Sequence, residues 1–181
     1  MTELLGAAMM IRATTHIRMN PYKPLVTSDL SAIQGKKAAQ LYQYWVEKSA
    51  DGATPQWSDF EFMDLYRIAP YMVALDVPTS TDRNELKYRF MGTEIVAFRS
   101  ARKVPDLTGM VFGEGERVYD PQPMLDAYDA SIKSGMPVVI YGEYQTDNSF
   151  GVHERLIAPW SIDGRVARLT TVLERHPKPT D

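Results

Sequence analysis

One stretch of the chain, residues 86–98, strongly limits the folds that the sequence can adopt. Its apolar residues alternate with the cationic Lys87 and Arg89, which predicts a strand with one covered and one charged face. Gly92 then permits a tight exit from the strand. Thr93 can cap the short helix that follows. The stretch therefore predicts a strand that turns directly into a helix.

Strands also dominate the C-terminal part of the sequence. Apolar patterning predicts strands at about 137–145, 152–161 and 165–174. Asp163-Gly164 separates the last two and is a strong signal for a type I′ hairpin. A helix is expected over 121–134, capped by Asp120 and ended by Gly135.

The N-terminal part is expected to be helical, with a further strand at about 71–77. Apolar residues at helical spacing predict a helix over about 31–48. Ser58 and Glu61 have the spacing of a capping box, which predicts a second helix that Pro70 stops. Two strands, two helices and three further strands then follow. This order predicts an α+β fold: a five-stranded antiparallel sheet with helices on one face and an N-terminal flanking helix.

Composition excludes several classes of protein. The net charge of −3 argues against a nucleic-acid-binding surface, which needs clustered lysine and arginine. No stretch approaches the roughly 20 apolar residues of a membrane span. The chain has no cysteine, so disulfides, cysteine-ligated metals and a flavin–cysteine adduct are excluded. This composition fits a reducing compartment, and we expect a cytoplasmic protein.

Five short motifs, followed by Asp163-Gly164, occur in a fixed order along the chain. They are Leu-x-x-Tyr-Trp from Leu41, Pro-Tyr-Met from Pro70, Tyr-Arg-x-x-Gly-Thr from Tyr88, Asp-Leu-Thr-Gly from Asp106 and Glu-Arg-Leu-x-x-Pro-Trp from Glu154. In this order they resemble the bacterial PAS domain family with an N-terminal Leu-x-x-Tyr-Trp helix, and the likeness spans about residues 38–174. Trp160 departs from the family, which usually has a smaller aliphatic residue there.

The resemblance implies a domain organisation and a general role. It implies a flexible N-terminal arm (1–27), an N-terminal helical extension (28–69), a PAS domain core (70–176) and a tail (177–181). PAS domains are sensory or protein-interaction domains that are often dimeric through the leading helix. They hold haem, flavins, small acids, lipids or nothing, so the resemblance names no cofactor.

A ligand pocket is expected on the concave side of the sheet, under the two central helices. Its expected lining is Phe90, Phe98, Met124, Tyr128, Ile140, Tyr141, Arg155 and Leu156. The alternative is that these side chains only fill the core. A buried arginine at position 155 would need a partner, and a ligand carboxylate is one candidate.

An interface is expected on the leading helix. A single helix is rarely stable in water, so it must pack on its own sheet or on a second chain. We expect a homodimer, with intramolecular docking as the alternative. Arg89 is expected to be ion-paired on the surface or to anchor a contact with a partner. The expected interface residues are Leu41, Tyr42, Trp45, Val46 and Arg89.

The sequence shows no recognisable catalytic or metal-binding pattern. His153 has no second histidine at ligand spacing, since His16 and His176 fall in the predicted terminal segments. The sequence therefore predicts a non-enzymatic PAS sensor or adaptor without an output domain, which binds a small ligand, a signalling protein or both. Two alternatives stay open: a small-molecule carrier or enzyme that uses the PAS cavity, and a purely structural interaction module.

Overall fold

The computed structural model describes residues 25–80, 85–100, 106–112, 122–146 and 149–177. Most of the predicted arm, and the helix cap predicted at Asp120, lie outside these ranges. The strands are β1 (Leu25–Thr27), β2 (Met72–Asp76), β3 (Lys87–Met91), β4 (Val138–Thr146), β5 (Ser149–Ile162) and β6 (Arg165–Pro177). The helices are α1 (Lys36–Lys48), α2 (Thr93–Ser100) and α3 (Gln122–Ser134), with the 3-10 turns η1 (Leu30–Ala32), η2 (Trp57–Asp59), η3 (Phe62–Leu65) and η4 (Ala69–Tyr71).

All strands of the described chain form one antiparallel sheet in the order β1-β4-β5-β6-β2-β3. The predicted α+β class and its five strands are confirmed. The sequence did not predict β1, which pairs with the edge of β4 through the last residues of the expected arm. The predicted hairpin is also confirmed, because Asp163 and Gly164 both have positive φ angles, 52° and 75°.

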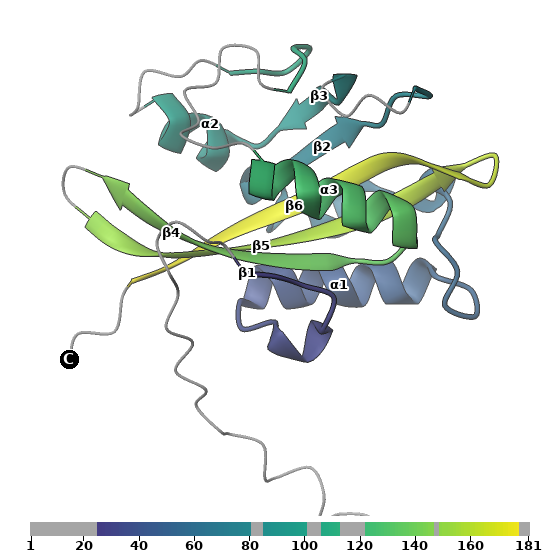
Figure 1. The fold of residues 1–181 in the computed structure, drawn as a ribbon, viewed down its shortest axis with the longest axis horizontal. Helices are drawn as coiled ribbons and strands as arrows, with labels where there is room; N and C mark the ends of the chain where they lie inside the picture. The colour runs from purple at the N-terminus through teal and green to yellow at the C-terminus, as the bar shows by residue number, and fades with distance from the viewer. Residues whose placement is uncertain (1–24, 81–84, 101–105, 113–121, 147–148, 178–181) are drawn as a thin grey trace, which may run out of the picture.

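The sheet separates two hydrophobic cores. Figure 1 shows α3 on one face of the sheet and α1 on the opposite face. The α3-side core includes Leu75, Tyr88, Ile95, Leu107, Tyr128, Ile140 and Ile157. The α1-side core includes Leu41, Trp45, Leu65, Tyr141, Leu156 and Trp160. Helices therefore cover both faces, and α1 is the element that closes the second one.

The helix predicted from Ser58 is wrong. The segment forms the three separate turns η2, η3 and η4, and Glu61 caps η3 by accepting the N–H of Met63 at 3.1 Å. Phe60 and Phe62 explain the difference, since their rings meet edge to face at 4.8 Å. In a continuous α-helix residues two apart point to opposite sides. The turns instead direct Phe60 towards Trp160, at 5.0 Å between ring centroids.

Two carboxylates of the sheet hold the start of α1. Gly35 precedes the helix and offers no side-chain cap. Glu154 of β5 accepts the N–H groups of Gln34 (3.2 Å) and Gly35 (2.9 Å), and Glu174 of β6 accepts that of Lys37 (2.8 Å). Glu154 and Glu174 are directly paired across the two strands. The unsatisfied amides of the helix therefore meet two negative charges, which stabilises this end of the helix dipole.

The residue at position 35 must be small for this arrangement to form. A Cβ atom at Gly35 would lie 2.3 Å from Oε2 of Glu174. His176 completes the cluster from the end of β6, with its Nε2 atom 3.4 Å from Oε2 of Glu154. Position 176 therefore belongs to the last strand, whereas the sequence placed it in a terminal segment.

The apolar side of α1 packs on the chain's own sheet. Leu41 is fully buried and Trp45 is 2% exposed. The indole N–H of Trp45 donates to the carbonyl of Pro159 at 2.7 Å. Val46, one residue further, is 46% exposed. In this chain the leading helix is thus docked intramolecularly.

Replacement of Trp45 tests this docking. We expect Trp45→Ala to lower the free energy of unfolding by about 3–5 kcal/mol, because it leaves a cavity and an unpaired carbonyl in the α1-side core. Val46→Ala is the matched control and should change the free energy of unfolding by less than about 0.5 kcal/mol. Urea unfolding followed by circular dichroism measures both. Equal effects at the two positions would contradict the docking.

The pH dependence of stability tests the anchor of α1. Burial raises the pKa of Glu154, while the amides of Gln34 and Gly35 and the imidazole of His176 oppose this rise. The folded protein therefore binds this proton more tightly than the unfolded chain does. The stability of the native chain relative to Glu154→Gln should increase as the pH falls from 8 towards the ordinary glutamate value of 4.5.

The comparison is best made with His176→Gln in both proteins, so that the imidazole does not titrate in the same range. Lys37, Glu174 and Tyr141 also face this cluster and are kept in both. Urea unfolding at a series of pH values gives the difference in free energy. A difference that is independent of pH, or that shrinks on acidification, would contradict the raised pKa.

Candidate functional site

The predicted ligand-lining residues are divided between the two faces of the sheet. Met124, Tyr128, Ile140 and Arg155 lie on the α3 side, while Phe90, Tyr141 and Leu156 pack against the α1-side core. Neighbouring residues of a strand point to opposite faces, so Leu156 cannot share a cavity with Arg155, nor Tyr141 with Ile140. The expectation of one shared cavity is therefore wrong for these three residues.

Two residues on the α1 side have structural roles instead. The hydroxyl of Tyr141 donates to the carbonyl of Ala32, and burial, with the nearby carboxylate of Glu154, raises the pKa of Tyr141. Trp160 is fully buried and donates from its indole to Oγ1 of Thr170 at 2.9 Å. The tryptophan that departs from the family thus fills the α1-side core and does not narrow the α3 side.

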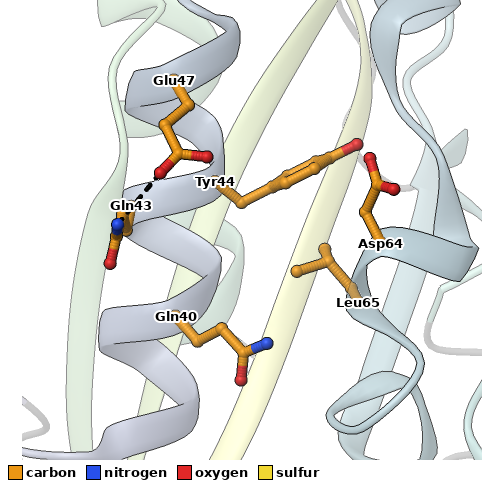
Figure 2. Close-up of a pocket in the computed structure, with 6 residues that line it drawn as sticks. All are labelled: Gln40, Gln43, Tyr44, Glu47, Asp64 and Leu65. Carbon is orange, nitrogen blue, oxygen red and sulfur yellow. Dashed lines mark hydrogen bonds between the residues drawn. The ribbon is translucent and has the colours of Figure 1, made fainter.

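One surface groove lies between α1 and η3. It has a volume of about 220 Å³ and is lined by Gln40, Gln43, Tyr44, Glu47, Asp64 and Leu65. Figure 2 shows that polar side chains border it and that Gln43 bonds to Glu47, at 2.9 Å.

The polar groups at this groove are largely engaged with the protein. The hydroxyl of Tyr44 accepts the N–H of Glu61 at 2.8 Å and donates to the carbonyl of Asp59. Burial raises the pKa of Tyr44. Asp64 pairs with Lys48 at 3.6 Å. The groove therefore has the features of a packed helix–turn junction and is a weak candidate for a ligand site.

A second surface hollow has a volume of about 200 Å³. Its lining residues are Val77, Pro78, Thr79, Ser80, Ile132, Arg165 and Val166. It lies where the C-terminal half of α3 approaches the β5–β6 hairpin, away from the predicted ligand residues.

The guanidinium of Arg155 is the least satisfied group on the α3 side of β5. Its Nη1 atom lies 3.3 Å from the hydroxyl of Tyr128 and 3.7 Å from the sulfur of Met124, both on α3. Its Nε atom is buried and has no hydrogen-bond partner among the described residues. No carboxylate pairs with Arg155 in the part of the chain that the structure describes. A half-buried cation whose Nε atom is buried and whose contacts are neutral carries a desolvation cost, and an anion beside it would offset this cost.

The expected interface residues also differ in their exposure to solvent. Leu41 and Trp45 are covered by the sheet, Tyr42 is half-buried, and Val46 is exposed. Arg89 forms an ion pair across β2 and β3, with its Nε atom 2.6 Å from Oδ1 of Asp76. These positions leave Val46 and Arg89 as the more accessible members of the set.

The described residues give no support to metal chemistry. Within them, no group of three or more histidine, aspartate or glutamate side chains could hold a metal ion. His153 is half-buried, and its ring lies over Gly142, where a Cβ atom would be 2.5 Å from Cε1. None of the helices in the described ranges has the length and apolar character that a membrane crossing requires.

Comparison with known proteins gives a likeness to solved structures. No family model matches the chain, and no curated protein is similar to it. The solved structure of an RNA-binding Light-Oxygen-Voltage receptor is similar, with 15% sequence identity and a TM-score of 0.45. The match covers 84% of this chain and 38% of the receptor chain.

The unsatisfied guanidinium predicts an unusual response to mutation. We expect Arg155→Met to leave the free energy of unfolding of the ligand-free protein unchanged or to raise it by about 1 kcal/mol, because a half-buried cation is replaced by an apolar side chain. Arg175→Met is the control, since that exposed guanidinium stacks on Phe98 at 4.4 Å. Arg175→Met should change the free energy of unfolding only slightly. Urea unfolding measures both, and a loss of more than about 1 kcal/mol at position 155 would assign Arg155 a supporting role in the fold.

Proposed function

We propose that this PAS-like chain is a cytoplasmic sensor or adaptor module that acts by binding a small anionic ligand beside Arg155. The observation that carries this proposal is the buried Nε atom of Arg155, which no described residue satisfies. A ligand carboxylate fits a guanidinium in a bidentate geometry and would provide the missing acceptor. The ligand would lie between α3 and β5.

The surroundings of Arg155 suit such a ligand. The hydroxyl of Tyr128 is beside the guanidinium and could orient a second polar atom of the ligand. Met124 borders the same position, and its flexible side chain can adapt to ligands of different shape. Apolar neighbours of the α3-side core would lower the local dielectric and strengthen the ion pair.

Strand β5 offers a route from this ligand to a response. Glu154 immediately precedes Arg155 in β5 and points to the opposite face of the sheet. There its carboxylate accepts the N–H of Gly35 and holds the start of α1. A ligand that repositions Arg155 would therefore bias β5 and, through Glu154, the seating of α1. We propose that a partner protein responds to this change.

The intramolecular docking of α1 limits which of its residues a homodimer interface could use. Leu41 and Trp45 are used inside the chain, so a second copy would contact the outer side of α1 at Val46 and Tyr42. Partners of this module are thus proteins and a small molecule. Nucleic acids and membranes are not expected, in line with the net charge of −3.

Ligand binding is the decisive test. The purified protein is examined by native mass spectrometry for a retained ligand and titrated calorimetrically with acetate, benzoate and succinate. At least one carboxylate should bind, and Arg155→Met should weaken its binding by about tenfold or more, the expected effect of losing a charged hydrogen bond. Arg175→Met, the control with the same charge change, should bind normally.

The outcomes separate the alternatives. Equal binding by the native protein and Arg155→Met would reject the site. Chemical turnover of the bound acid, abolished by Tyr128→Phe, would favour a small enzyme. Absence of any ligand, together with an unperturbed α1, would favour a purely structural interaction module.

A further inference from the structure

A group of charged residues lies on the α1 side of the sheet, on β6, β2 and β3. Arg168 and Asp76 are direct partners across β6 and β2, and Asp76 also faces Lys87 across β2 and β3. The Nε atoms of Arg89 and Arg168 approach the same carboxylate oxygen, Oδ1 of Asp76, at 2.6 and 3.0 Å. One carboxylate oxygen is thus shared by two guanidinium groups.

A third guanidinium adds to the excess of positive charge. Arg165 donates to the carbonyls of Pro78 (3.1 Å) and Val166 (3.3 Å), and no carboxylate pairs with it among the described residues. Burial lowers the pKa of Arg168, and the charges of Arg89 and Arg165 lower it further, whereas Asp76 opposes this change. The charges of Arg89 and Arg165 thus disfavour the cationic form of Arg168, and Asp76 partly offsets their effect.

These arginines are held in place but keep free donors. Arg89 and Arg168 each approach Asp76 with Nε alone, and Nη1 of Arg168 donates to the carbonyl of Ala167 at 2.7 Å. Among the described residues, the Nη groups of Arg89 and the Nη2 group of Arg168 are therefore left for another acceptor. The side chain of Arg89 is 44% exposed and that of Arg168 is 19% exposed. Arg168 also lies over the half-buried ring of Trp57, at 6.0 Å from its centroid. An incoming chain would meet preorganised cations beside an aromatic surface.

Backbone pairing at the neighbouring sheet edge is already occupied. β3 is the edge strand, and its N–H and C=O groups at Tyr88 bond to Met110 and Gly109, while Leu86 accepts from Phe112. A partner can therefore not simply add a strand along this part of β3. Recognition here must use the charged side chains on the face of the sheet.

We propose that Arg89, Arg165 and Arg168 form a docking surface for an acidic segment of a partner protein. Its aspartate or glutamate carboxylates would accept the guanidinium donors that Asp76 leaves unused and would reduce the repulsion among the arginines. A nucleic acid fits less well, because Asp76 lies at the centre of the surface and the chain carries a net charge of −3. The inference rests on the proposed adaptor function, which requires a surface for a partner.

A peptide-binding experiment tests the surface. The probe is a short fluorescein-labelled peptide of alternating glutamate and glycine, followed by fluorescence polarisation with the full chain. Arg89→Gln/Arg165→Gln should weaken binding by about tenfold, the combined effect expected for two partly exposed ion pairs. Arg89→Lys/Arg165→Lys should retain most of the affinity, and added salt should weaken binding to the native chain.

The matched control is Arg67→Gln/Lys36→Gln, which removes two exposed cations elsewhere on the chain. It should bind like the native protein. Arg168 is left intact in every variant because it packs against Trp57, and circular dichroism checks that each variant is folded. Equal losses in the control, equal binding of a glutamine–glycine peptide, or tighter binding of a single-stranded RNA that depends on the same arginines would overturn the proposal.

Carboxylate titration of the same variants separates this inference from the proposed ligand site. A Gln double variant that binds the small acid normally but has lost the peptide supports the docking surface independently of Arg155. Native protein that binds the small acid but not the peptide overturns the docking surface alone. Peptide binding without small-acid binding would reject the ligand site and leave the surface in place.

Discussion

The contact on which the rest of this structure depends is the pair of carboxylates under the first turn of α1. Glu154 and Glu174 accept the amides at the start of a helix whose preceding glycine provides no cap of its own. This contact fixes α1 on β5 and β6, so that Trp45 reaches the carbonyl of Pro159 and the α1-side core is closed. That face of the sheet is therefore closed by the chain itself.

Strand β5 joins the two faces through consecutive residues. Arg155 points towards α3 with an unsatisfied nitrogen, while Glu154 points towards α1 and is fully engaged. One face thus has a half-buried cation whose Nε atom has no acceptor among the described residues, and the other has a buried carboxylate with several hydrogen bonds. We propose that a movement of the strand that satisfies the cation is transmitted to the anchor of the helix, since the two residues are adjacent in β5. In the docking surface proposed at Arg89, Arg165 and Arg168, the pair formed by Arg168 and Asp76 lies on the α1 side, where a partner protein could respond to such a movement.

Local sequence signals predicted several elements well and failed where long-range packing decided the outcome. Asp163-Gly164 specified its hairpin, and the alternation around Tyr88 specified β3, because both depend on neighbouring residues alone. The capping pattern at Ser58 did not produce a helix, since the ring of Phe60 packs against Trp160, a hundred residues away. The strand order, and the addition of β1 to it, also required the tertiary structure.

The candidate site shows the same division. The sequence by itself determined that Arg155 and Glu154 point to opposite faces of a strand, because side chains alternate along a strand with a period of two. The same rule should have separated Leu156 from Arg155. Only the tertiary structure decided which face each charge occupies, that α1 rather than a ligand satisfies Glu154, and that two arginines from different strands share Asp76. These outcomes depend on which strands lie side by side, and strand pairing is set by contacts between residues far apart in the chain.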